Sequence, residues 1–222
     1  MSSAMRSDFV VYGYFRSSAA FRVRIALNLK GIEPEWKFIH LLKDGGQQHA
    51  PDYKAVNPQE LIPTLVHDGH TIGQSLAIIE YLEEVQPEPH LLPGDPAGRA
   101  RVRQLADMVA CDIHPVNNLR VLFHLRDEWG ASEERRAAWQ RHWISLGFAA
   151  IETLLAGSRQ TGRYCHGDAP TLADICLIPQ LANARRVNLD LSPYPTILRI
   201  EHTALAHPAF AAALPAAQPD AE

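Results

Sequence analysis

Two adjacent serines, Ser17 and Ser18, lie where a segment with strand character passes into one with helical periodicity. A hydroxyl and the first free amide groups of a helix can both face one anion and stabilise it. Serine at this position also commonly caps a helix without any further role. The two serines alone therefore favour capping, and an anion site here depends on what surrounds them.

A second polar pair, Gln74 and Ser75, precedes another predicted helix. The pair combines an amide side chain, a hydroxyl and a helix N-terminus, which together suit a carboxylate. Simple capping of that helix explains the same residues equally well. The pair by itself does not decide between these two interpretations.

Three arginines are candidates for binding an acidic substrate, because arginine binds carboxylates through two parallel hydrogen bonds. Arg16 adjoins the first serine, Arg120 follows two asparagines, and Arg186 ends a predicted helix. An arginine near a helix C-terminus often serves the helix dipole or a surface ion pair, so Arg186 has an equally good structural explanation. Arg22 and Arg24 are expected on a solvated or interdomain face.

The segment that contains both polar pairs has the pattern of a small α/β domain. β-branched and aromatic residues mark its strands, and glycine or proline follows each helix. Asp68-Gly69 between two apolar runs is typical of a two-residue hairpin turn. Strands are predicted at residues 9–14, 35–40, 62–67 and 70–73, and helices at residues 19–30 and 75–86.

A segment dense in proline, residues 88–96, marks a linker between this domain, residues 1–87, and a helical domain, residues 97–222. Thr171 and Asp174 stand three residues apart before an apolar run, as in an acidic variant of the capping box. The Ala/Pro-rich tail after Phe210 is expected to be poorly ordered. Helices are predicted at residues 97–126, 132–156, 171–186 and 196–206.

Composition excludes several classes of function. The net charge of -4, with acidic and basic residues mixed along the chain, predicts no nucleic-acid or anionic-membrane partner. Residues 1–8 lack the apolar run of an export leader, and no stretch reaches the ~18 apolar residues of a membrane span. The eleven histidines show no metal-binding spacing, so no metal is expected. Three cysteines without a C-x-x-C pair, Cys111, Cys165 and Cys176, fit a reducing compartment and predict a cytoplasmic location.

The run at residues 14–27 resembles the Ser-Ser-Cys active-site motif of zeta-class glutathione transferases, and further motifs match in order over nearly the whole chain. Ala19 stands where that family usually has cysteine, so any contribution of that thiol should be missing here. The other matching motifs are Asn57-Pro58, residues 62–65, residues 74–82, residues 111–115, residues 117–120, Gly167-Asp168 and residues 171–174.

The resemblance implies a thioredoxin-like N-terminal domain followed by an all-helical C-terminal domain, usually in a homodimer, with glutathione as cofactor. It also implies a cis peptide bond before Pro63; the alternative is a proline that merely opens an edge strand. Carried over by position, the catalytic residues are Ser17 and Ser18, and the substrate-binding residues are Arg16, Arg120 and Arg186. The glutathione contacts are Ser17, Gln48, Ile62, Pro63, Gln74, Ser75, His114, Asn118, Leu119 and Arg120.

The implied reaction is the isomerisation of maleylacetoacetate to fumarylacetoacetate, in which the glutathione thiolate adds to the cis double bond, the bond rotates, and the thiolate is eliminated. A thiol of pKa ~8.5 must be shifted by about two units, or ~2.7 kcal/mol, to be largely ionised near neutral pH. Ser17 is the predicted source of the stabilising hydroxyl. The alternatives are the same chemistry on maleylpyruvate, which Leu119 before Arg120 disfavours slightly, a transferase for small electrophiles such as α-haloacids, and a non-catalytic scaffold on the same fold.

Overall fold

The computed structural model describes residues 8–222. Residues 1–7, on which the expected absence of an export leader partly rests, lie outside the described residues. Contacts divide the chain into two compact units, the first made of Met1–His90 with His207–Glu222 and the second of Leu91–Ala206. The predicted domain boundaries stay a prediction, but the last residues of the chain contact the first unit.

The first unit is built on a four-stranded mixed sheet in the order β2-β1-β3-β4. β1 and β2 are parallel and are joined by helix α1, whereas β3 pairs antiparallel with β1 and β4. The predicted strands and the hairpin at Asp68-Gly69 are confirmed. The elements are β1 (Val10–Gly13), α1 (Ser18–Lys30), β2 (Glu35–Phe38), β3 (Thr64–His67) and β4 (His70–Gly73).

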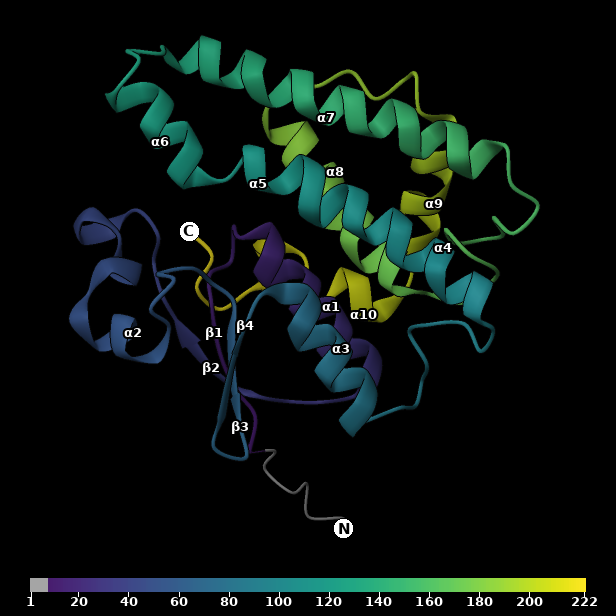
Figure 1. Cartoon of the computed structure of the whole chain (residues 1–222), viewed down its shortest axis with the longest axis horizontal. Helices are drawn as coiled ribbons and strands as arrows, with labels where there is room; N and C mark the ends of the chain where they lie inside the picture. The colour runs from purple at the N-terminus through teal and green to yellow at the C-terminus, as the bar shows by residue number, and fades with distance from the viewer. Residues whose placement is uncertain (1–7) are drawn as a thin grey trace. The chain divides into compact units, whose positions relative to one another are not determined.

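Helices cover both faces of this sheet (Figure 1). α1 packs beside α3 (Ser75–Val85) on one face, over the fully buried Val11 and Leu65. The short helix α2 (Pro51–Val56) lies toward the other face, where the Tyr53 and Tyr12 rings are 5.5 Å apart. α2 was not predicted, although proline at the first helical position is a recognised start signal. Two 3-10 turns, η1 (Lys43–Gly45) and η2 (Gln47–His49), precede it.

α1 begins after its N-cap Ser17 and ends at Gly31, whose φ of 65° is the left-handed conformation that glycine adopts readily. Arg22 and Arg24 are predicted on a solvated or interdomain face, and the solvated alternative is wrong. They are 1% and 4% exposed, and each donates to an acceptor distant in sequence within the first unit, Arg22 to Ser75 Oγ and Arg24 to the Ala213 carbonyl.

The second unit is helical and is centred on α8 (Leu172–Arg186), in which residues 172–181 are all buried. The Thr171–Asp174 capping box is confirmed. Helix α4 (Pro96–Asp107) packs on α8, and α7 (Glu133–Ala156) packs on α9 (Pro195–Leu205). The predicted helices at 132–156, 171–186 and 196–206 are confirmed within one residue as α7 (Glu133–Ala156), α8 and α9 (Pro195–Leu205).

The single helix predicted at residues 97–126 is wrong. The chain forms four pieces there. The first three follow one another without leaving the helical region, and Pro115, which has no N–H to donate, lies in the third. The helix breaks at Asn117 and Asn118, where the Asn118 side chain caps a new helix by accepting the Arg120 N–H at 3.1 Å. The pieces are α4 (Pro96–Asp107), the π-helical segment η3 (Met108–Ile113), α5 (His114–Val116) and α6 (Leu119–Asp127).

The expectation of a poorly ordered tail is also wrong. α10 (Pro208–Ala211) packs against α1, and the turn η4 (Pro215–Ala217) follows it. The Phe15 N–H donates to Asp220 Oδ2 at 2.8 Å, so the last residues of the chain lie on the loop after β1.

None of the helices within residues 8–222 is long and apolar enough to cross a membrane. The same residues contain no group of three or more His, Cys, Asp or Glu side chains placed to hold a metal ion. Of the three free cysteines, Cys165 and Cys176 are buried and Cys111 is exposed.

Candidate functional site

Three of the predicted segments meet at one edge of the sheet in the first unit. Tyr12 of β1 pairs with Thr64 of β3, which pairs in turn with Gly73 of β4. The chain therefore leaves β1, enters β3 and leaves β4 at the same edge. The residues just beyond that edge are Ser17 and Ser18 after β1, Ile62 and Pro63 before β3, and Gln74 and Ser75 after β4.

Ser17 has the first of the two roles that the sequence left open, the capping of α1. Its backbone is extended, with φ -72° and ψ 118°, and its Oγ caps α1 by accepting the Ala20 N–H at 3.2 Å. A hydroxyl that accepts through a lone pair can still donate its proton, so Ser17 can donate to an anion beside the helix N-terminus. Ser18 is the buried first residue of α1, and the neighbouring Arg16 is exposed.

Gln74 has a backbone conformation that is unusual for its residue type. Its φ is 66°, a region that costs a non-glycine residue of order 1–3 kcal/mol and that concentrates at functional sites. Its side chain donates to Gln59 Oε1 at 2.7 Å and makes no capping hydrogen bond to α3. Ser75, 6% exposed, accepts a hydrogen bond from Arg22 Nη1 at 3.1 Å. The Gln74 side chain therefore does not cap α3, and it makes no hydrogen bond to the first backbone amides of this helix.

Gln48 has a buried side-chain oxygen, Oε1, that lacks a hydrogen-bond partner among the described residues. The residue is 8% exposed, and its Nε2 lies 3.0 Å from His49 Nε2. Its Oε1 is buried and accepts no hydrogen bond from the described residues. Gly46, with a φ of 100°, lies so close that an added Cβ would be 2.6 Å from Gln48 Nε2. A buried carbonyl without a donor marks a place where a ligand N–H can bind.

The segment that carries Ile62 and Pro63 is held by side chains that the residue-by-residue prediction missed. The Ile62–Pro63 peptide bond is cis, as predicted. The Tyr53 hydroxyl donates to the Leu61 carbonyl at 2.6 Å, and Asn57 Nδ2 donates to the same oxygen at 2.8 Å. Both side chains also contact Thr64 Oγ1 at 2.9 Å. Burial raises the pKa of Tyr53, so its hydroxyl stays a donor.

The remaining predicted residues belong to the second unit. His114 follows the π-helical segment, and such segments are frequent at functional sites. Asn118 caps α6, which begins at Leu119. Arg120 and Arg186 are exposed, whereas Arg185 is engaged by Glu201, with Nη2 2.6 Å from Oε2.

Comparison with known proteins identifies the family. Residues 16–85 match the model of the glutathione S-transferase N-terminal domain, and residues 134–213 match that of its C-terminal domain. The chain belongs to the glutathione S-transferase family.

Individual relatives narrow this assignment to the zeta class. The chain is 48% identical over 212 residues to a probable maleylacetoacetate isomerase of Vibrio cholerae, covering 96% of this chain and 98% of that protein. A holo structure of a bacterial zeta-class maleylpyruvate isomerase matches with a TM-score of 0.93 and 49% identity, covering 96% of this chain and all of that one. A maleylacetoacetate isomerase from Methylobacterium extorquens AM1, solved with malonate and glutathione, matches with a TM-score of 0.92 and 46% identity, covering 96% and 99%. The predicted fold and family are confirmed.

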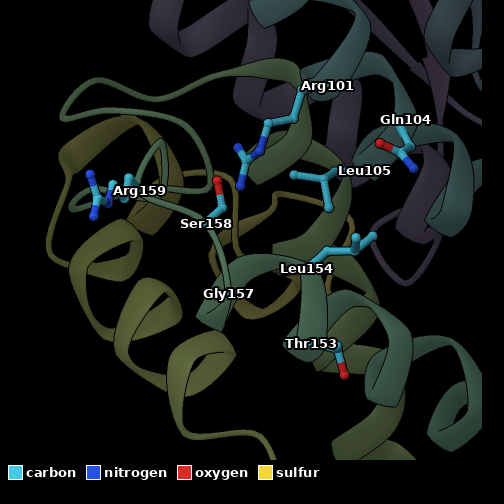
Figure 2. A pocket seen from close by; sticks show the side chains of 8 residues that line it. All are labelled: Arg101, Gln104, Leu105, Thr153, Leu154, Gly157, Ser158 and Arg159. Atoms are coloured by element: carbon cyan, nitrogen blue, oxygen red, sulfur yellow. The ribbon is translucent and has the colours of Figure 1, made fainter.

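The transferase also has a cavity of about 520 Å³ in its second unit that contains no predicted site residue. Arg101 points toward Ser158 inside it, whereas Arg159 extends away from the other lining side chains (Figure 2). Arg101 is already engaged, since it donates to the Cys165 carbonyl at 2.7 Å and to Thr161 Oγ1 at 2.8 Å. This cavity is therefore supported by a structural arginine and is not the predicted site. Its lining residues are Arg101, Gln104, Leu105, Thr153, Leu154, Gly157, Ser158 and Arg159.

Proposed function

We propose that this transferase catalyses the glutathione-dependent cis–trans isomerisation of maleylacetoacetate to fumarylacetoacetate. The observation that carries the proposal is the convergence, at one sheet edge, of the Ser17 hydroxyl with the N-terminus of α3. Relatives at 46–49% identity with maleylacetoacetate or maleylpyruvate isomerase activity in their names support it.

The polar groups of the first unit fit glutathione. The tripeptide has a carboxylate for the N-terminus of α3 and Ser75, peptide N–H groups for the buried Gln48 Oε1, and a thiol for Ser17. Ile62 and Pro63 present backbone beside these groups at the same edge. When bound, glutathione would supply a thiolate nucleophile for reversible addition to the substrate's cis double bond, the chemistry that cis–trans isomerisation requires.

Ser17 has the task of keeping that sulfur ionised. A charge-assisted hydrogen bond contributes ~1.5–3 kcal/mol and a helix N-terminus ~0.3–2 kcal/mol, which together cover the ~2.7 kcal/mol needed to lower a thiol pKa by two units. Ser18 starts α1 and presents one of its first amides. In the second unit, His114, Asn118 and Leu119 are the proposed further contacts to the cofactor.

Arg16, Arg120 and Arg186 are the proposed substrate ligands. The substrate is a diacid, and exposed guanidinium groups bind carboxylates with little desolvation cost. An arginine beside a substrate carbonyl also stabilises the negative charge that develops on its oxygen during the reaction.

The direct test is an ultraviolet assay of the purified protein with maleylacetoacetate and, separately, with maleylpyruvate, each with and without glutathione. We expect conversion of maleylacetoacetate only when glutathione is present, and a Ser17→Ala rate lower by about 10²–10³, the cost of losing one oxyanion-type donor. Faster conversion of maleylpyruvate would favour that isomerase, a reading supported by the 49% identical structure with that name. If neither substrate is converted, dehalogenation of α-haloacids is the next activity to assay. A protein without that activity would fit a scaffold role.

We also infer that the protein is a cytoplasmic homodimer of aromatic-compound catabolism. The free cysteines support a reducing compartment. Leu146 and Leu154 on α7, 60% and 39% exposed, support burial of this helix face against a second copy. Light scattering of the protein as it elutes from a size-exclusion column tests the dimer, since a molar mass equal to one chain would contradict it.

A further inference from the structure

The last residues of the chain are held against the segment that leads into Ser17. Arg24 of α1 donates from Nε to the Ala213 carbonyl at 3.0 Å and from Nη2 to the Phe15 carbonyl at 3.1 Å. Its Nη1 also donates to the Tyr14 carbonyl at 3.4 Å. Burial lowers the pKa of Arg24 to about 10, which still leaves it charged near neutral pH. One buried cation therefore fixes both the start of the tail and the loop after β1.

Asp220 closes the same arrangement from the end of the chain. Its Oδ2 accepts the Phe15 N–H at 2.8 Å, so the peptide groups around Phe15 are fixed on both sides, by Arg24 and by Asp220. Ala221 packs against the buried cluster that includes Tyr14, Phe15 and Ile62. These contacts place the tail on the segment after β1 and on the buried cluster to which Ile62 also belongs.

The bond to Phe15 matters because of where this residue lies. β1 ends at Gly13 and α1 begins at Ser18, so the Phe15 N–H belongs to neither a ladder nor a helix. Within the same turn, the Ser17 N–H donates to the Tyr14 carbonyl at 3.1 Å. A carboxylate is a stronger acceptor than a neutral group, so it holds the Phe15 N–H more firmly than a neutral acceptor would.

We propose that Asp220 is a positioning residue for Ser17. By accepting the Phe15 N–H, the side-chain carboxylate of Asp220 holds the β1–α1 turn in the geometry that directs the Ser17 hydroxyl toward the cofactor sulfur. The inference rests on the proposed function and extends it, since it makes the C-terminal residues part of the machinery that ionises the thiol.

The test compares Asp220→Ala with Asp220→Asn. The alanine variant loses the acceptor, so the isomerase kcat should fall between about tenfold and a hundredfold, the range in which small displacements of a catalytic group lower rates. The pH–rate profile and the ultraviolet absorbance of the bound thiolate should both shift to higher pH. The asparagine variant keeps an acceptor oxygen, so it should retain most of the activity and the wild-type pH profile.

Two other results would overturn the proposal. If Asp220→Ala lowers both the thermal stability and the glutathione affinity but leaves the pH–rate profile unshifted, Asp220 is a structural residue only. A shift to lower pH in Asp220→Asn would mean that the negative charge, rather than the hydrogen bond, acts on the thiol. Glu222→Gln is the matched control, because Glu222 lies two residues away, is 51% exposed and pairs with Lys43 at the surface.

The proposed function and this inference fail in different ways. An inactive wild type would remove the proposed function, and amide hydrogen exchange of Phe15 and Ser17 in wild type and Asp220→Ala would then decide whether the tail fixes the turn. An active wild type with an equally active Asp220→Ala would remove the inference alone.

Discussion

Arg22 Nη1 donates a hydrogen bond to Ser75 Oγ at 3.1 Å, and the two residues are only 1% and 6% exposed. Arg22 lies in the second turn of α1 and Ser75 is the first residue of α3, so this bond ties together the two helix N-termini that flank the proposed glutathione site. A charged donor aimed at Ser75 also adds positive potential where a carboxylate is expected to bind.

Replacement of Arg22 should therefore weaken glutathione binding more than it slows turnover. In Arg22→Met, the methionine side chain is similar in length to arginine but cannot donate a hydrogen bond to Ser75. We expect the glutathione dissociation constant to rise about tenfold, which is the effect of one hydrogen bond to a charged group. Calorimetric titration measures this directly. Arg135→Met, at an exposed arginine of the second unit, is the control. Unchanged affinity in Arg22→Met would show that Ser75 does not need this bond.

Gln74 should illustrate a conflict between stability and binding. Glycine adopts a φ of 66° without the penalty paid by glutamine, so Gln74→Gly should raise the free energy of unfolding by about 1 kcal/mol and Tm by about 2–4 °C. The same change removes the amide and should weaken glutathione binding. Thermal unfolding and titration of one preparation test both effects. A less stable Gln74→Gly protein would mean that the bond to Gln59 outweighs the backbone cost.

Asp174 gives a pH dependence of known sign. Burial raises the pKa of Asp174 above its ordinary value, although its hydrogen bonds to Cys165 and Thr171 act in the opposite direction. Because the folded pKa lies above the unfolded one, the native state binds the proton more tightly, and the contribution of Asp174 to stability falls as pH rises through that window. The free energy of unfolding of wild type minus that of Asp174→Asn should therefore decrease from about pH 4 to pH 7. Urea unfolding at both pH values measures it, and an increase would contradict the assigned direction.

Thiol reagents should label this enzyme without inactivating it. Cys111 is exposed, Cys165 and Cys176 are buried, and burial raises the pKa of Cys165 well above its usual value. Mass spectrometry after iodoacetamide treatment should find Cys111 alkylated first, with activity retained. Ala19→Cys should introduce sensitivity to oxidants beside Ser17. Rapid loss of activity in the wild type would place one of the native thiols in the mechanism.

Local signals in the sequence predicted the framework well. The Asp68-Gly69 turn, the Gly31 helix end and the Thr171–Asp174 box all act through neighbouring residues, and all are present in the structure. Asn117 and Asn118 held the signal for the broken helix, but the surrounding apolar periodicity outweighed them in the prediction. The zeta-class assignment came from motifs spread over the whole chain, which no single motif could have supported.

Long-range partners account for the errors at the buried arginines and in the C-terminal tail. The burial of Arg24 depends on the Ala213 carbonyl, 189 residues away, and the order of the tail depends on a bond between Phe15 and Asp220, 205 residues apart. Neither pairing leaves a periodic trace in the sequence. The lack of a hydrogen-bond donor to Gln48 Oε1 is likewise visible only once Gly46 and His49 are placed around that side chain.

The return of residues 207–222 to the first unit sets an order of events during synthesis. The ribosome releases β1 and α1 early, yet Asp220, the acceptor for the Phe15 N–H, is translated 205 residues later. The nascent first unit must wait for translation of the entire helical unit before this loop can reach its native contacts. A purification tag fused after Glu222 would burden the same contacts, so a tag at the opposite terminus is the safer choice for kinetic work.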